Sequence, residues 1–211
     1  MDSAAGGAVE RERHRDLDRL LTFVDAIVAI AITLLVLPLV ELAPELHEGG
    51  RAADLLRDHS DELWAVALSF YVIARIWLGQ HHAVAPLVVG NARTTTLLLT
   101  WAFTIVVLPF PTSLVAASGG QATVKVLYVG TVALGVLLNA GLRAEVQRHP
   151  ELTDGAAYEG PLGSLLTALL LLVALAVMLL LPATSYVPIL VLAAEGRLKA
   201  LVESLRNRRS T

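Results

Sequence analysis

Long apolar runs separated by short polar segments dominate the chain. A bilayer core about 30 Å thick needs about 20 mostly apolar residues for each spanning helix. Six segments have about this length, so we expect six transmembrane helices in an all-α membrane protein. They run approximately over residues 17–40, 61–83, 92–116, 123–142, 161–181 and 186–201. The sixth is the weakest, because it becomes charged from Glu195 onward.

The connections between these segments are short, which favours antiparallel packing of neighbouring helices. Gly119 and Gly120 mark one turn, and Pro182 and Pro188 bracket the last one. The Pro109-Phe110-Pro111 sequence predicts a kink in the third segment. The first segment contains Asp25 and lacks a small-x-small cleavage site, so we expect a retained helix rather than a signal peptide.

The composition indicates one membrane domain over residues 1–211, with a flexible stretch at 1–15 and a basic tail at 205–211. Of the residues 55% are hydrophobic, and the mean hydropathy is +0.66. The absence of cysteine excludes disulfides, thiolate metal sites and a cysteine nucleophile. A net charge of -3 gives no support for nucleic-acid binding.

Lysine and arginine gather on one side of the predicted membrane, which indicates that this side is cytoplasmic. Twelve lie there: Arg11, Arg13, Arg15, Arg19, Arg93, Arg143, Arg148, Arg197, Lys199, Arg206, Arg208 and Arg209. The other side has three, Arg51, Arg57 and Lys125, and Arg75 falls inside the second segment. We therefore expect a multi-pass protein of the cell membrane with both termini in the cytoplasm.

Asp25 is unusual, since a carboxylate in a spanning helix costs about 2.5 to 3.5 kcal/mol. Counted from the cytoplasmic ends of the helices, Arg75 is level with Asp25, which predicts an ion pair or a hydrogen-bonded cluster. Trp77, His81 and His82 could add donors. We expect a structural role for Asp25; a proton relay is the alternative.

The sequence carries no enzyme motif and no metal motif. His81 and His82 are adjacent, so on a helix they point about 100° apart and cannot both bind one ion without a third ligand. A potassium-channel filter of the TVGYG kind is absent, and the loops are too short for a re-entrant pore segment. If the protein conducts ions, side chains of its spanning helices must line the path.

Four residues of the first segment share one helical stripe: Ile30, Thr33, Leu34 and Leu37. Asp25 lies about 140° around the helix from Ile30, so it faces a different neighbour. The residues alone favour packing of this stripe against another helix.

The first two segments carry a more specific pattern. The residues Arg19, Phe23-Val24-Asp25, Ala29-Ile30 and Thr33-Leu34-Leu35 resemble the R-x-x-x-F-S-D signature and the first helix of the transmembrane protein 175 family of potassium channels. The resemblance implies a bacterial member of this family. Trp77 with His81-His82 is similar to the W-x-x-x-H-H end of the family's second helix, followed by Asn91 and Pro109-Phe110. Val24 stands where the family has serine.

The resemblance implies a homotetramer in which the first helices line a central pore that prefers potassium. It places the hydrophobic constriction at Ile30, further layers at Leu34 and Leu37, and a polar layer at Thr33. Supporting residues are Arg19, Phe23, Asp25, Arg75, Trp77, His81 and His82. Permeant K⁺, the bilayer and further copies of the chain are the implied partners, with no cofactor.

Two other functions remain open. A proton-coupled secondary transporter would use Asp25 and His81, although the inverted repeat and the paired broken helices of such carriers are missing. A non-conducting membrane scaffold is the other alternative.

Overall fold

The computed structural model describes residues 2–44, 51–118, 120–155, 158, 160–181, 186 and 188, with side chains from residue 12 onward. In this part of the chain all regular structure is helical. The helices are α1 (Asp2–Leu34), α2 (Leu37–Val40), α3 (Ala52–Asp58), α4 (Ser60–Val84), α5 (Ala92–Val107), α6 (Pro109–Ser118), α7 (Ala122–Arg148), the 3-10 helix η2 (Pro150–Thr153) and α8 (Leu162–Leu180). The all-α prediction is confirmed.

Five helical segments are long and apolar enough to cross a membrane. They are Glu12–Val40, Ser60–Val84, Ala92–Ser118, Ala122–Arg148 and Leu162–Leu180. They agree with the first five predicted spans. The sixth predicted span, 186–201, and the basic tail at 205–211 lie outside the described residues, apart from 186 and 188.

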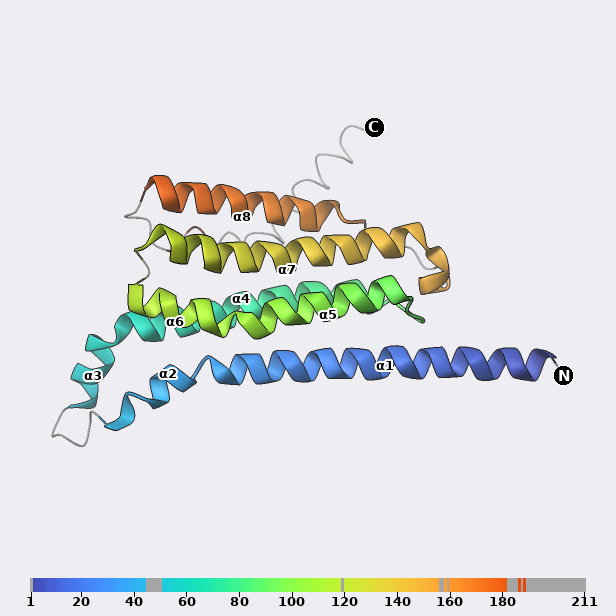
Figure 1. The fold of residues 1–211 in the computed structure, drawn as a ribbon, viewed down its shortest axis with the longest axis horizontal. Helices are drawn as coiled ribbons and strands as arrows, with labels where there is room; N and C mark the ends of the chain where they lie inside the picture. Colours follow the sequence, from blue (N-terminus) through green and yellow to red (C-terminus); the bar gives the residue numbers. More distant parts are fainter. Residues whose placement is uncertain are drawn as a thin grey trace, which may run out of the picture.

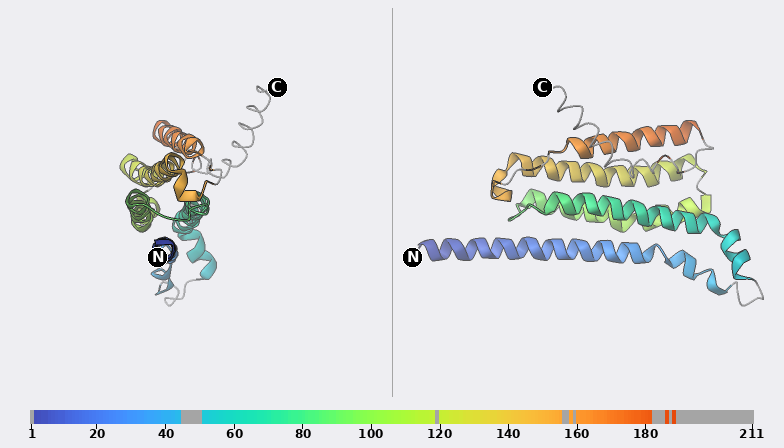
Figure 2. Two further views of the ribbon diagram at one scale, coloured as in Figure 1. Left: turned by 90° about the vertical axis from the view of Figure 1, so that its right-hand side faces the viewer. Right: turned by 180° about the vertical axis from the view of Figure 1, so that it is seen from behind.

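The spanning helices pack as an antiparallel bundle in layers (Figure 1). Helix α1 forms one outer layer, α4 lies beside α5 and α6 in the next, and α7 and α8 follow on the far side. The view from behind in Figure 2 shows the same order, with the first residues of α1 extending past the ends of the other helices. Within the described part of the chain, helix α1 therefore has neighbours on one side only.

Two prolines break the spans. Helix α5 ends at Val107 and α6 begins at Pro109, which confirms the predicted kink, because proline lacks the N–H that would continue the ladder. Pro38 acts in the same way on α1. Before it, Leu35 and Val36 donate their N–H groups only three residues back, to Ile32 and Thr33. Leu37 therefore belongs to α2, beyond a break that the helical projection did not contain.

The N-terminal segment differs from the prediction of a flexible stretch at residues 1–15. Helix α1 begins at Asp2 and runs without interruption into the membrane span. Alanine, glutamate and arginine predominate in this stretch, and all three have high helix propensity. Composition rich in alanine and glycine had suggested disorder, yet the two glycines do not interrupt the helix.

One stripe of α1 packs against the bundle. Val24, Val28, Ala31 and Leu35 are buried at spacings of three and four residues and join the main core with residues of α4 and α5. Val24 is 0% exposed, so the position of the family's serine is part of an apolar contact. A second core, here called the terminal cluster, lies at the end of the bundle where α4 ends and α5 begins. It consists of Leu17, Ala83, Val84, Leu87, Leu98, Leu142, Val146 and Leu152.

Candidate functional site

The face of α1 opposite its buried stripe is open. Ile30 is 59% exposed, Leu34 is 46% exposed, and Leu37, at the start of α2, is 54% exposed. Thr33 is exposed between them. The four residues predicted to line the pore thus share one uncovered surface of a single chain, which we call the open face of α1.

Of these four residues of the open face, Thr33 is the one with a polar side chain. Its Oγ1 donates to the backbone oxygen of Ile30 over 2.7 Å. The hydroxyl proton is used in this bond, so the oxygen keeps its lone pairs for another ligand. A hydroxyl held in this way can face a cation.

Arg19 and Phe23 also lie on the exposed surface of α1. Both fall within about 20° of Ile30 in helical projection, at 100° per residue. The first two residues of the R-x-x-x-F-S-D pattern therefore continue the open face toward the N-terminus. Asp25 points elsewhere.

Asp25 faces α4. The Nε1 of Trp77 donates to the Oδ1 of Asp25 over 2.8 Å, and this bond ties α1 to α4. The sequence had predicted an ion pair or a hydrogen-bonded cluster of Asp25 with Arg75, to which Trp77 could add a donor. The Trp77 donor is present, and the pairing with Arg75 stays a prediction. Arg75 and Trp77 are two residues apart, which places them about 160° apart around α4.

His81 and His82 extend this cluster toward the end of α4. The ring centroids of Trp77 and His81 are 5.5 Å apart, and those of His81 and His82 are 6.3 Å apart, edge to face. Both histidines are exposed. Among the described residues, no group of three or more histidine, cysteine, aspartate or glutamate side chains is placed to hold a metal ion.

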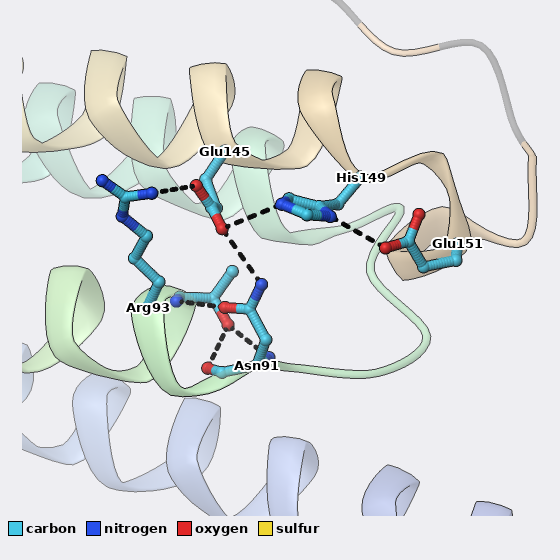
Figure 3. Close-up of polar contacts among 6 residues, drawn as sticks. Asn91, Arg93, Glu145, His149 and Glu151 are labelled. Atoms are coloured by element: carbon cyan, nitrogen blue, oxygen red, sulfur yellow. Dashed lines mark hydrogen bonds and ion pairs between the residues drawn. The ribbon is translucent and has the colours of Figure 1, made fainter.

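A second polar cluster, which sequence reasoning missed, joins α5 to α7 and η2 (Figure 3). We call it the Glu145 cluster, and it consists of Asn91, Arg93, Thr94, Glu145, His149 and Glu151. Its centre is the Glu145 side chain, which is 4% exposed although it carries a carboxylate. Asn91 Nδ2 donates to Glu145 Oε1 over 3.1 Å. Arg93 Nη1 and His149 Nε2 approach its two oxygens to 3.6 and 3.5 Å.

Residues of the Glu145 cluster also form the beginning of α5 and the end of α7. Asn91 caps α5: its side chain accepts from the N–H of Thr94, and the hydroxyl of Thr94 accepts from the N–H of Asn91. On the other side, His149 Nδ1 lies 2.8 Å from Glu151 Oε1. The pKa of Glu151 is below its usual range, because a backbone N–H and then the His149 side chain stabilise the carboxylate. The Asn91-x-x-Thr94 spacing is the sequence signal that could have revealed the cap.

Further buried polar groups tie α7 to its neighbours. Tyr128 and Ser69 share a hydrogen bond of 3.0 Å, and Thr112 donates to Ser69 over 2.8 Å, which links α7, α4 and α6. Lys125 Nζ donates to the carbonyl of Met178 in the last turn of α8 over 2.9 Å. These bonds join α4, α6, α7 and α8 to one another.

Comparison with known proteins finds one family that part of the chain resembles. Residues 19–109 match the family described as endosomal/lysosomal potassium channel TMEM175. The match begins at Arg19, contains the open face of α1 and the Asp25 to Trp77 bond, and ends at the proline break after α5. No curated protein and no solved structure is significantly similar to the chain. Residues 19–109 of the chain are therefore similar to the TMEM175 family of potassium channels.

Proposed function

We propose that this protein is a potassium-preferring cation channel, in which four copies surround a central pore lined by α1. The exposure of Ile30 carries the proposal. A large apolar side chain in the middle of the candidate span Glu12–Val40 is uncovered, on a helix whose neighbours among the described residues lie on one side only. The potassium-channel description of the family supports the same function.

The open face requires further copies to enclose a path. One helix contributes one stripe, and one stripe cannot surround a column of ions. In a closed ring of four copies each chain presents the same surface to the axis. Four Ile30 side chains then form a narrow apolar ring, and such a ring closes a pore by excluding water.

The proposed preference for potassium rests on the ring of Ile30 side chains and the layer of Thr33 hydroxyls. An apolar ring of this kind admits an ion only after part of its hydration shell is removed, and K⁺ gives up water more readily than Na⁺. The Thr33 hydroxyls, with lone pairs directed away from the Ile30 carbonyls, are placed to replace part of the lost hydration. K⁺ is then the permeant ion, and the proposal needs no other cofactor.

We place the protein in a cell membrane with both termini in the cytoplasm. Arg19, Arg93 and Arg148 lie at the end of the bundle where the chain enters α1, whereas Glu41, Asp54 and Asp58 lie at the other end. Loops rich in arginine are retained on the cytoplasmic side.

The proton-coupled transporter would need Asp25 to pass protons toward His81. The hydrogen bond of Asp25 goes instead to the indole of Trp77, which is a donor with no acceptor atom. An indole cannot accept the proton that Asp25 would release. The geometry therefore favours a positioning role for Asp25, which holds α1 on α4.

Reconstitution in liposomes tests the proposal. Purified protein should carry K⁺ down its gradient, faster than Na⁺ under the same conditions, and native mass spectrometry should give a mass of four chains. Flux that requires a proton gradient would support the transporter. The channel proposal fails if no K⁺ passes.

A further inference from the structure

The Glu145 cluster contains one histidine between two carboxylates. His149 Nε2 lies 3.5 Å from Glu145 Oε1, and His149 Nδ1 lies 2.8 Å from Glu151 Oε1. Glu145 belongs to α7 and Glu151 to η2. One imidazole ring therefore spans the joint at which α7 ends and the chain turns back toward α8 (Figure 3).

The two protonation states of His149 differ in what they can bond. A neutral imidazole has one N–H and one lone pair, so it can donate to only one of the two carboxylates. With the N–H on Nδ1, donated to Glu151, the lone pair of Nε2 faces the Glu145 oxygen. A protonated ring donates at both nitrogens and places a positive charge between two negative ones.

Arg93 also carries a positive charge near Glu145, but it does not replace His149 as the partner of this carboxylate. Arg93 approaches the second oxygen of Glu145, Oε2, but its side chain is 71% exposed, so water and salt screen its charge. Asn91 donates a neutral hydrogen bond to Oε1. The loop between α4 and α5, residues 85–90, contains no ionisable side chain. Among these partners, His149 is the one imidazole, the type of side chain that serves proteins as a pH switch.

The turn from α7 into η2 is connected to α1 through the loop before α5. The N–H of Val88 donates to the carbonyl of Leu152 in η2 over 2.8 Å, which ties the loop before α5 to η2. At Gly90 the backbone approaches Leu17 of α1 so closely that an added Cβ would lie 3.5 Å from its Cδ1. Leu17 and Leu152 both belong to the terminal cluster, together with Leu98, Leu142 and Val146. The cluster of charges thus covers the apolar surface on which the beginning of the α1 span rests.

We propose that His149 makes this joint a pH-sensitive clasp. Its protonation ties α7 to η2, to which the loop before α5 is bonded, and thereby stabilises the contact of Leu17 of α1 with the terminal cluster, so that the current through the pore depends on pH at this face. The first half of the inference concerns this chain alone. The second half rests on the proposed function.

Hydrogen exchange tests the clasp without any transport. Backbone amides of residues 87–94, 149 and 151–153 should gain about two- to five-fold protection in the wild type between pH 8 and pH 6, after correction for intrinsic exchange, which is the effect of one partly exposed ion pair. His149→Gln should abolish the gain, and His149→Arg should keep protection high at both values. His14→Gln, the same change at an exposed position of α1, should behave like the wild type. An equal gain in His149→Gln overturns the clasp.

Planar-bilayer recording tests the link to the pore. When the pH of the chamber that faces the clasp changes from 8 to 6, the K⁺ current of the wild type should change by about two- to five-fold. The current of His149→Gln and His149→Arg should not change, whereas that of His14→Gln should follow the wild type. Equal pH dependence in all four proteins overturns the link even if exchange confirms the clasp. A wild type without current contradicts the proposed function and the link together, and leaves the exchange result as the separate test of the clasp.

Discussion

The indole N–H of Trp77 donates to the carboxylate of Asp25 over 2.8 Å, across the contact between α1 and α4. The two residues lie 52 positions apart in the chain. Asp25 is exposed on the surface of the single chain, yet it makes a directed bond to a neighbouring helix. The bond fixes the rotation of α1 about its own axis, and with it the direction in which Ile30 points.

Loss of this bond should loosen α1. Trp77→Phe keeps an aromatic ring but removes the donor, and we expect it to lower the free energy of unfolding by about 1 kcal/mol, since the acceptor is charged but solvent-exposed. Thermal unfolding in detergent measures the change. Asp25→Asn retains an acceptor oxygen and should cost less. Equal losses in both variants would mean that the carboxylate charge, rather than the hydrogen bond, stabilises the contact.

Five of the spans could be predicted because hydropathy and length determine them directly. The residues near Asp25 could be predicted from depth, but which of them donates to it could not, because depth in the membrane is a poor guide to rotation. Arg75 and Trp77 differ by about 3 Å in depth but by about 160° around α4. The amphipathic signal of a helix that is apolar on all sides does not say which of the two turns toward α1.

The Glu145 cluster escaped prediction for another reason. Asn91 and Glu145 are 54 residues apart, and they meet only because α5 and α7 pack antiparallel with a particular register. Single charged residues near predicted helix ends resemble ordinary solvated groups. Burial of the Glu145 side chain to 4% exposure, which marks it as structural, is a property of the packed bundle.

Asn91 should contribute to stability in two ways, as the cap of α5 and as a partner of Glu145. Asn91→Ala removes both bonds, and we expect a loss of about 1 to 2 kcal/mol. Gln121→Ala is the matched control, because Gln121 occupies the same position before α7 and makes no capping bond with its side chain. Chemical denaturation of both variants in one detergent checks the difference. Similar losses would contradict the role of the cap.

The carboxylate of Glu151 should stabilise the folded protein at neutral pH and lose this effect in acid. Its pKa in the folded protein lies below its ordinary value of 4.5, so the folded state favours the carboxylate. This contribution is fully present above the ordinary pKa and is lost as the pH falls through the lower, folded value. We expect Glu151→Gln to show a smaller decrease in melting temperature than the wild type between pH 5 and pH 3. Parallel decreases would show that other carboxylates account for the acid sensitivity.

Two glycines of α7 should respond oppositely to the same substitution. A Cβ at Gly135 would lie 3.0 Å from Thr104 Oγ1, which is held by its bond to the Trp101 carbonyl, so Gly135→Ala should destabilise the contact between α5 and α7 by about 1 to 3 kcal/mol. At Gly130 a Cβ would meet no atom within 4 Å. Gly130→Ala should therefore stabilise the helix by about 0.5 to 1 kcal/mol. Thermal unfolding compares them, and a loss at both positions would contradict the tight approach at Gly135.

Ile30 should control the flux. Ile30→Asn places a polar group in the apolar ring and Ile30→Ala widens it, so both should raise K⁺ flux into liposomes, since a wetter or wider ring no longer excludes water. Leu99→Ala is the matched control, because Leu99 is also a large exposed apolar residue of a spanning helix, but it lies on α5. Its flux should equal that of the wild type. If neither Ile30 variant changes the flux, the constriction lies elsewhere on the path; if Leu99→Ala changes it equally, the variants act through the bundle and not through a pore on α1.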